Sequence, residues 1–467
     1  MRLVGDARCN AVVSWRHRSA GMQTAETVAH GWGGTKGVVV KDTDSMGIDA
    51  SFQPVDWSTT GLPTDPDEIV ASIIDPERRG ELYPLYQQLR QVAPVHKCPP
   101  DLLQGMWVLS RYADIKKLVS AKAAVNDPQV AEAAYNHGDG SFFGVMQNMM
   151  LFQESASHRR IRSLAVSAFT PHAIARWRPI AERVANELCD AVEGDGGMDL
   201  VRQYNYELPF NVIAHVLGVA EADFPLIKQL ASDFARAGER LVSDEVARRG
   251  DDAARGFQSY FGDLIKMRRA VPSDDLLSSL VGAQDGDDRL SLAELVSNCI
   301  LLMQAGHETT QDLLGNAMIA LARHPDQLAL LCSRPELTKS AIEEFLRYDC
   351  PVQLNYRTLL EDMEFGGVTI PAGNVVCVAY GAANRDPEQF HDPNRLDITR
   401  EPNQHLAFSF GAYYCLGATL ARTEAYVGIR TLLDRFPAIQ PASDSFEWRD
   451  TLGLRGPARL DVVWSRA

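Results

Sequence analysis

A long apolar helical pattern dominates the middle of this 467-residue chain. It covers about residues 291–323, and the pair His324-Pro325 stops it, because proline disfavours a continued helix. Helical patterns dominate the chain from about Asp67 onward, whereas strand-like alternation appears only in short pieces. The sequence therefore predicts a mainly α fold with small β-sheets.

Residues 1–60 differ from the rest of the chain. They mix Gly, Thr, Ser and Asp with no sustained period, as in residues 30–37, and we interpret them as an N-terminal tail of unknown role. No linker interrupts the helical patterns after this tail. We therefore predict one domain over residues 61–467.

The composition excludes several classes of protein. Hydrophobic residues make up 45% of the chain, as in globular proteins, and the net charge of −15 argues against nucleic-acid binding, which needs a basic surface. No apolar run approaches the ~18 residues of a membrane span, and no signal peptide is evident at Met1. The eight cysteines show no CxxC spacing, so we expect mostly inert thiols in a reducing cytoplasm.

One cysteine lies in an unusual setting. Cys415 sits in a glycine-flanked aromatic loop, residues 405–418, that leads directly into a helical pattern. Gly411 and Gly417 permit close backbone approach to a flat ligand, and the first N–H groups of the helix would stabilise a thiolate. Cys-x-Gly alone more often marks a buried structural cysteine, but Phe408 and Gly411 at their offsets favour a single soft ligand for iron.

An acid and an alcohol stand side by side in the long helix, in the segment Ala305–Thr310. Thr309 is expected to bond back to a carbonyl one turn earlier, and Gly306 leaves space beside the helix, which together would open a groove for dioxygen and water. Glu308 and Thr309 would then relay protons, general-acid work worth about 10²–10⁴-fold. The zinc pattern HExxH starts here too, but its fifth position is Gln311, so that template fails. Taken alone, the segment is equally compatible with a polar face in contact with solvent.

A third motif consists of charged residues. Glu344 and Arg347 are three apart, so they share one face of a helix predicted over about 336–348. Alone this is typical of a surface pair. Arg395 lies in an irregular Pro-rich stretch, and a buried Glu344 bonded by both arginines would lock that stretch beneath the cysteine loop.

A further set is cationic. His158 and Arg162 are four apart on one helical face, and Arg357 follows the helix over 336–348. A single basic residue usually belongs to a solvated face. Together they would also suit the two propionates of haem, which need cationic partners.

These motifs together resemble the cytochrome P450 superfamily of the soluble bacterial type, over about residues 67–467. The cysteine loop is similar to the family pattern Phe-x-x-Gly-x-His/Arg-x-Cys-x-Gly at Phe408, Gly411, Cys415 and Gly417. The resemblance implies that Cys415 is the metal ligand, that Glu308 and Thr309 are the catalytic pair, and that Glu344, Arg347 and Arg395 are structural. The residues it places at the cofactor are His158, Arg162, Ala305, Gly306, Arg357, Phe408, Gly411, Tyr413, Cys415 and Gly417.

Tyr413 is the one clear departure from the pattern, because the family usually has His or Arg there. A phenol can donate a hydrogen bond to a propionate but brings no charge. Anchoring of the haem would therefore depend more on His158, Arg162 and Arg357.

The resemblance implies a P450 fold, with haem b (iron protoporphyrin IX) between the long central helix and the cysteine-loop helix. It implies a monooxygenase that inserts one atom of O2 into a mainly hydrophobic small molecule, by hydroxylation or epoxidation. Only about 50 residues follow Cys415 and no flavin or iron–sulfur domain is appended, so electrons are expected from a ferredoxin and its NAD(P)H-dependent reductase. We further expect a cytoplasmic monomer without a membrane anchor.

The substrate pocket is expected, by family position, to draw on residues 141–153, 299–305, 350–354 and 451–454. Its predicted members are Phe143, Val145, Met146, Met149, Leu301, Leu302, Gln304 and Val352. Most are apolar or pliant, which favours a terpenoid, steroid, fatty or aromatic substrate, while Gln304 serves either as a polar handle or as a structural residue.

Two other functions compete with monooxygenation by external electrons. A peroxide-driven haem-thiolate enzyme is disfavoured by Glu308 and Thr309, since such enzymes typically lack the acid–alcohol pair. A non-catalytic haem sensor predicts no substrate-dependent spin shift and no oxygenated product.

Overall fold

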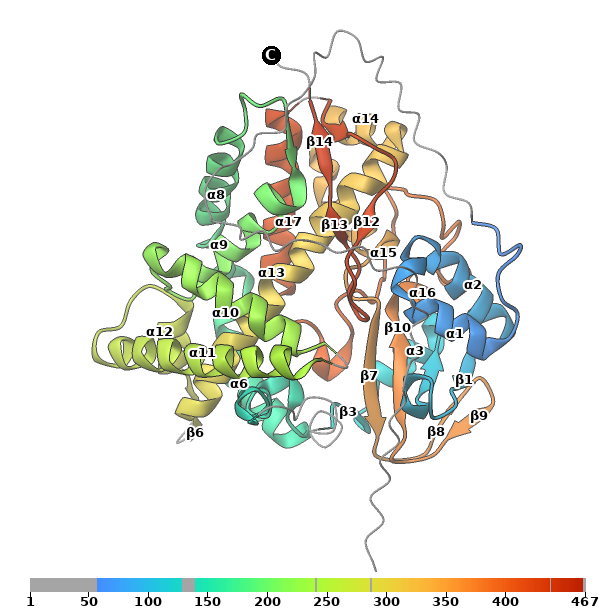
Figure 1. The fold of residues 1–467 in the computed structure, drawn as a ribbon, viewed down its shortest axis with the longest axis horizontal. Coiled ribbons are helices and arrows are strands. Elements are labelled where there is room, and N and C mark those ends of the chain that lie inside the picture. The colour runs from blue at the N-terminus through green and yellow to red at the C-terminus, as the bar shows by residue number, and fades with distance from the viewer. Residues whose placement is uncertain (1–56, 128–138, 240–241, 286–287, 437, 465–467) are drawn as a thin grey trace, which may run out of the picture. The chain divides into compact units, whose positions relative to one another are not determined.

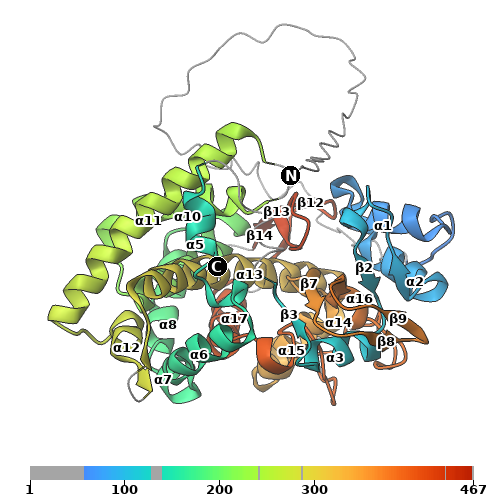
Figure 2. The ribbon, with the colours of Figure 1, turned by 90° about the horizontal axis from the view of Figure 1, so that it is seen from below.

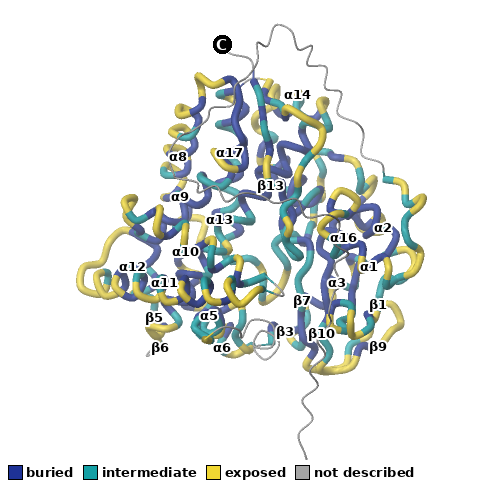
Figure 3. Tube along the Cα trace, viewed as in Figure 1, coloured by how far each residue is buried: buried dark blue, intermediate teal, exposed yellow. Residues whose placement is uncertain are grey.

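The long apolar pattern forms a single helix, α13 (Leu292–Arg323), through the middle of the molecule (Figure 1). The computed structural model describes residues 57–127, 139–239, 242–285, 288–436 and 438–464. The helix begins with a capping box, in which Ser291 accepts from the Glu294 N–H and the Glu294 carboxylate accepts from the Ser291 N–H. It ends before His324, because Pro325 starts the next helix. Most of α13 is buried (Figure 3).

Helices also form most of the surroundings of α13 (Figure 2). The other α-helices of the described chain are α1 (Pro66–Ile74), α2 (Leu82–Val92), α3 (Tyr112–Ser120), α5 (Ser141–Met146), α6 (Ser155–Val166), α7 (Pro171–Ala175), α8 (Arg178–Asp190), α9 (Glu207–Val216), α10 (Phe224–Ala237), α11 (Asp244–Ala270), α12 (Leu276–Gly282), α14 (Pro325–Ser333), α15 (Thr338–Tyr348), α16 (Tyr380–Ala383) and α17 (Ala418–Arg435).

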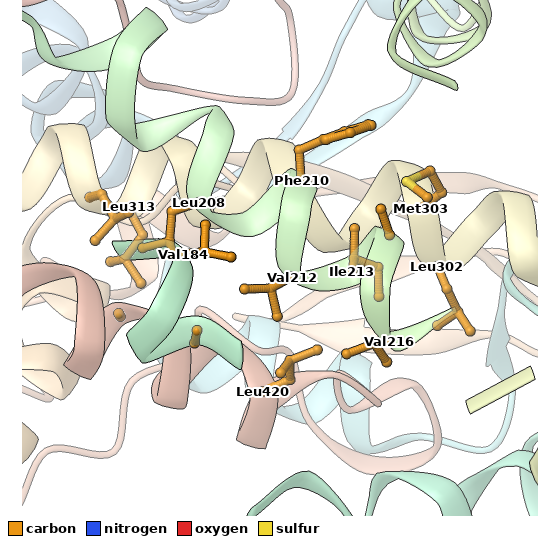
Figure 4. Close-up of a cluster of buried hydrophobic side chains, with 14 of the residues drawn as sticks. Val184, Leu208, Phe210, Val212, Ile213, Val216, Leu302, Met303, Leu313 and Leu420 are labelled. Carbon is orange, nitrogen blue, oxygen red and sulfur yellow. The ribbon is translucent and has the colours of Figure 1, made fainter. Parts of the chain in front are cut away.

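The largest apolar core joins α8, α9, α13 and α17, which pack against one another. Figure 4 shows part of it, with Phe210, Val212 and Ile213 of α9 among side chains from the other three helices. Burying such side chains stabilises the fold by about 1.5–3 kcal/mol each. This core fixes α13 relative to α17, and the loop that carries Cys415 directly precedes α17.

A five-stranded sheet lies apart from this core, in the order β1-β2-β10-β7-β3 (Figure 1). Its strands are β1 (Val95–Lys97), β2 (Trp107–Leu109), β3 (Ala124–Val125), β7 (Leu354–Leu359) and β10 (Val375–Ala379). The pair β2 and β10 is parallel, with Cys377 opposite Val108, and the other pairs are antiparallel. Strand β7 carries Arg357, and its neighbours on both sides fix its position.

Smaller sheets complete the described fold. Their strands are β4 (Gly197–Asp199), β5 (Gln284–Asp285), β6 (Asp288–Arg289), β8 (Met363–Phe365), β9 (Val368–Ile370), β11 (Gln440–Pro441), β12 (Glu447–Trp448), β13 (Pro457–Arg459) and β14 (Asp461–Val463). Strands β12 and β13 form an antiparallel hairpin near the C-terminus. A separate three-stranded sheet has the order β11-β14-β4.

The predicted mainly α fold with small sheets is confirmed. The predicted helices over 291–323 and 336–348 correspond to α13 and α15. Residues 1–56 of the predicted tail lie outside the described residues, so the division at residue 60 stays a prediction. Within the described ranges, no helix is both long and apolar enough to cross a membrane.

Candidate active site

One cavity of about 280 Å³ brings together the motifs that lie far apart in the sequence. Its wall includes Cys415 from the loop before α17, Thr309 from α13 and His158 from α6. The other predicted site residues that line it are Arg162, Leu301, Leu302, Ala305, Gly306, Val352, Phe408, Tyr413 and Gly417. A thiol, an alcohol and a cationic group therefore face a common space with a largely apolar wall.

The cysteine loop is held in a conformation that depends on Gly411. This residue has φ +69°, and a Cβ added to it would lie 2.7 Å from the Val119 carbonyl oxygen. The loop closes through the Cys415 N–H, which donates to the Phe408 carbonyl at 2.9 Å. Gly411 therefore allows close contact with the end of α3, as an L side chain would not.

The Cys415 thiol is subject to opposing influences. Burial raises its pKa, while the backbone N–H of Gly417 and the nearby guanidinium groups of Arg162 and Arg422 act to lower it. One N–H at the start of α17 thus supports the thiolate, as the sequence led us to expect. In the protein alone, burial outweighs this support.

A cationic group occupies one end of the cavity around Tyr413. The ring of His158 lies 4.3 Å from the Tyr413 ring, and the Arg357 guanidinium lies 4.7 Å from the same ring. Burial, followed by Arg162 and Arg357, lowers the pKa of His158 to about 4. Among the described residues no carboxylate forms an ion pair with His158, Arg162 or Arg357, and the buried Arg357 Nε has no hydrogen-bond partner. This end of the cavity is therefore built to accept an anion.

The acid and the alcohol of α13 point to different surroundings. Thr309 Oγ1 donates to the Ala305 carbonyl at 2.9 Å, the back-bond that the sequence predicted, and it lines the cavity. The Glu308 carboxylate does not line the cavity and instead accepts from Arg449 at 2.7 Å. Only one member of the predicted catalytic pair thus faces the cavity directly.

Similarity to known proteins identifies the family of this chain. The cytochrome P450 family model matches residues 332–453. A biotin biosynthesis cytochrome P450 of Bacillus subtilis is 36% identical over 396 residues, which cover 85% of this chain and 99% of that protein. This chain belongs to the cytochrome P450 family. The 6-deoxyerythronolide B hydroxylase of Saccharopolyspora erythraea is 37% identical over 396 residues, covering 81% of this chain and 96% of the hydroxylase.

A solved P450 structure has the same fold. The crystal structure of P450BioI in complex with hexadec-9Z-enoic acid ligated acyl carrier protein matches with a TM-score of 0.79 and 34% identity, over 85% of this chain and all of that one. The P450 fold and the assignment of the chain as a P450 monooxygenase follow from these similarities.

The cavity fits the haem that the P450 family implies. Cys415 supplies one soft ligand, and Arg162 and the nearby Arg357 supply cations without a protein carboxylate to neutralise them. His158, whose pKa of about 4 leaves it neutral near pH 7, supplies a ring N–H. Gly417 lines the cavity, and a Cβ added there would meet no atom within 4 Å, so the space beside the loop is open. Cys415 would ligate the iron, and the guanidinium groups of Arg162 and Arg357 with the neutral His158 ring would hold the propionates, with Tyr413 beside His158 and Arg357.

The arginine pair of Glu344 differs from the prediction. Arg347 donates to both carboxylate oxygens of the fully buried Glu344 at 2.8 Å, as expected. The second arginine is Arg400, whose Nε lies 3.1 Å from Glu344 Oε2, and the prediction of Arg395 was wrong. Arg395 contributes its backbone carbonyl, which accepts from Arg347 at 3.1 Å, while its side chain is exposed. The chain turns between the two positions, so the later arginine faces the carboxylate.

Several residues predicted for the substrate pocket do not line the cavity. Val145, Met146 and Met149 are buried in the main core, and Phe143 packs against that core. Gln304 donates to the Ala231 carbonyl of α10 at 3.0 Å, which supports its structural interpretation. The residues that line the cavity from the same part of the chain are instead Met150 and Leu151.

A second cavity shares Leu151 and Asn355 with the first. It is lined by residues that include Leu103, Met106, Phe152, Leu354 and residues 451–454. The predicted contribution of 451–454 to the pocket therefore lies in this second space.

Two polar residues of the site were not predicted from the sequence, one lining the first cavity and the other lining the second cavity. Glu424 of α17 lines the first cavity, and burial raises its pKa well above the ordinary value, while a hydrogen bond with Thr310 opposes this rise. Asn126 donates its N–H to the Tyr413 hydroxyl at 3.3 Å, and its amide oxygen accepts from Arg357 at 2.9 Å. An acid among the apolar residues of α17 was a usable signal for Glu424, by the same argument that singled out Glu308. Asn126 carried no such signal.

Proposed function

We propose that this P450 is a haem-b monooxygenase that uses O2 and electrons from a separate redox protein to oxygenate a mainly hydrophobic small molecule. The observation that carries the proposal is the single cavity in which Cys415, Thr309 and the cationic group around Tyr413 meet. When bound, haem with a thiolate ligand would supply O2 activation, because the thiolate favours O–O cleavage.

The protein's own part in this reaction is to deliver protons and exclude water. Thr309 lines the cavity, and its hydroxyl donates to the Ala305 carbonyl. When this back-bond opens, the hydroxyl can instead donate a hydrogen bond into the cavity. Leu301, Leu302 and Val352 give the cavity a dry wall, which strengthens polar interactions inside it. Glu308, one residue before Thr309, is the nearest acid on the helix that could resupply its proton.

An apolar substrate is supported by the two adjoining cavities, whose shared wall includes Leu151. The related P450BioI structure contains a hexadecenoic acid ligated to an acyl carrier protein. A panel of fatty acids, carrier-linked acyl chains, steroids, terpenoids and aromatic compounds should therefore be tested for a haem spin-state shift. A shift with members of the panel followed by an oxygenated product supports the proposal, whereas binding without product favours a haem sensor.

Replacing Thr309 tests the role of the alcohol. In Thr309→Ala, product formed per NAD(P)H consumed should fall by about 10²-fold, the lower end of what a positioned proton donor contributes. The control is Ser279→Ala in α12, which removes the same kind of back-bond, to the Asp275 carbonyl, outside the cavity. Full coupling in Thr309→Ala, or equal turnover of the wild type with peroxide alone, would contradict the proposed relay.

The surface beside the cysteine loop is our proposed docking site for the electron donor, a ferredoxin reduced by an NAD(P)H-dependent reductase. Phe410 and Tyr414 are exposed there, Lys116 lies 5.1 Å from the Phe410 ring, and Arg422 lines the same hollow. In Lys116→Glu the first electron transfer should slow and lose much of its salt dependence. Lys266→Glu, on α11, is the matched control, and equal slowing in both variants would place the docking site elsewhere.

A further inference from the structure

Arg449 joins two carboxylates of the central helix. Its Nη2 donates to Glu308 Oε2 at 2.7 Å, and its Nη1 lies 3.1 and 3.2 Å from the two oxygens of Asp312. Glu308 and Asp312 are one helical turn apart, so they present their carboxylates on the same face of α13. One guanidinium is therefore shared between two acids.

The hairpin of β12 and β13 brings Arg449 to this place. The Arg449 backbone N–H donates to the Gly456 carbonyl at 3.0 Å, and this hydrogen bond closes the hairpin next to α13. A Cβ added to Gly456 would collide with the Asp312 carboxylate. The fit of the hairpin on the helix thus requires glycine at this point, and it fixes the distance that the Arg449 side chain must span.

The two acids differ in their surroundings. The Glu308 side chain is 20% exposed, whereas the Asp312 side chain is fully buried. Burial raises the pKa of Asp312 to about 7, against the attraction of Arg449 and with further repulsion from Glu308 and Asp349. Other charged groups near this cluster are Arg455, which pairs with Asp349 at 2.9 Å, and Glu239, which interacts electrostatically with Glu308, Arg449, Asp450 and Arg79.

We propose that Arg449 is a positioning residue for Glu308, and that Asp312 sets how firmly Arg449 holds it. The proposal rests on the proposed monooxygenase function. Glu308 is held outside the cavity by Arg449, while Thr309 faces the cavity, so inward proton transfer requires the Glu308 carboxyl to leave the guanidinium. An ionised Asp312 competes for the same guanidinium and repels Glu308, which weakens the hold. When Asp312 is neutral, Glu308 is the only one of the two acids that carries a negative charge to attract Arg449, so it is held more firmly.

Two variants, compared with the wild type, test this arrangement during turnover. In Asp312→Asn, product formed per NAD(P)H should fall by up to about tenfold, the effect of strengthening one charge-assisted hydrogen bond, and the solvent isotope effect should rise. The wild type should become better coupled as pH rises through about 7, the pKa of Asp312, and Asp312→Asn should lose this dependence. Arg449→Gln combined with Asp312→Asn should restore coupling, because the hold on Glu308 is gone.

Arg459→Gln is the matched control, because Arg459 lies on the same hairpin and pairs with Asp461 at the surface. It should leave coupling and its pH profile unchanged. If Asp312→Asn keeps the wild-type profile, or if the double variant is as poorly coupled as Asp312→Asn, the proposal is overturned. A purely structural role would lower the unfolding temperature of the Arg449 and Asp312 variants without moving the pH profile.

Infrared spectroscopy gives a readout that does not depend on activity. Between about pH 6 and about pH 8, one unit on each side of the Asp312 pKa, the wild type should lose one protonated-carboxyl band that Asp312→Asn lacks. Persistence of that titration in Asp312→Asn would assign the band to another carboxyl and overturn the role proposed for Asp312. If the protein shows this titration but oxygenates no substrate with any electron donor, the proposed function is refuted. The titration of Asp312 would then be real but would have no proton delivery to control.

Discussion

Replacing Arg400 should destabilise the protein much more than replacing Arg395, although both lie in the same irregular stretch. The Arg400 side chain is 11% exposed and bonds the fully buried Glu344 carboxylate. It also donates to the His391 carbonyl at 2.7 Å. The Arg395 side chain is exposed, and its part in the network is a backbone carbonyl that any residue would supply.

The sizes of these effects follow from burial. Hydrogen bonds to charged groups contribute about 1.5–3 kcal/mol, so Arg400→Gln should lower the free energy of unfolding by roughly that amount. Arg347→Gln should cost more, about 3–5 kcal/mol, because it breaks a fully buried ion pair with Glu344. Arg395→Gln should stay within about 0.5 kcal/mol of the wild type, as is usual for surface substitutions.

Urea unfolding of the haem-loaded variants, followed by tryptophan fluorescence, measures this order. At equal slopes, the shift of each midpoint gives the change in unfolding free energy. Equal shifts for Arg395→Gln and Arg400→Gln would refute the assignment of Arg400 as the second partner of Glu344. A loss in Arg347→Gln no larger than that in Arg395→Gln would refute the claim that the pair is buried.

Three further predictions concern the cavity and its surroundings. Because burial raises the Asp312 pKa from its ordinary value of 3.8 to about 7, the folded state keeps a proton that the unfolded state loses, so stability should fall as pH rises from about 4 to about 7. Asp312→Asn should remove this loss, on the order of 4 kcal/mol, in unfolding measured across that range. Because burial and neighbouring cations lower the His158 pKa to about 4, stability of the haem-free protein should instead rise with pH between about 4 and about 6.5, and His158→Gln should flatten that rise in thermal unfolding. Gly411→Ala places a Cβ against the Val119 carbonyl at φ +69°, so the haem content of the purified protein should drop well below that of Ala412→Gly, a control in the same loop.

Local patterns predicted the elements that carry the site. The apolar run over 291–323 and the terminating Pro325 gave α13 almost to the residue, because both signals act within a few turns of the helix. Thr309 and its back-bond to Ala305 were predictable for the same reason, since donor and acceptor lie four residues apart. The glycines around Cys415 similarly reported the tight loop in which it lies.

Contacts between distant segments were less predictable. A charged pattern indicated that Glu344 needs a second arginine, but the turns of the irregular stretch decide whether Arg395 or Arg400 reaches it. The apolar residues of α5 were expected in the pocket, yet Val145 packs into the core. Apolar side chains suit a core and a substrate pocket equally well, so their chemistry alone does not distinguish the two.

The orientation of the Glu308 side chain shows why a motif can be predicted from the sequence although the contacts of its residues cannot. Its partner Arg449 lies 141 residues away, in a two-strand hairpin whose sequence shows no link to α13. Once the hairpin is in place, the collision at Gly456 explains its close fit, and the carboxylate of Asp312 explains why one arginine serves two acids. Under the proposed function, the acid–alcohol pair gives the type of chemistry, whereas the hairpin of β12 and β13 determines when the acid is free to take part in it.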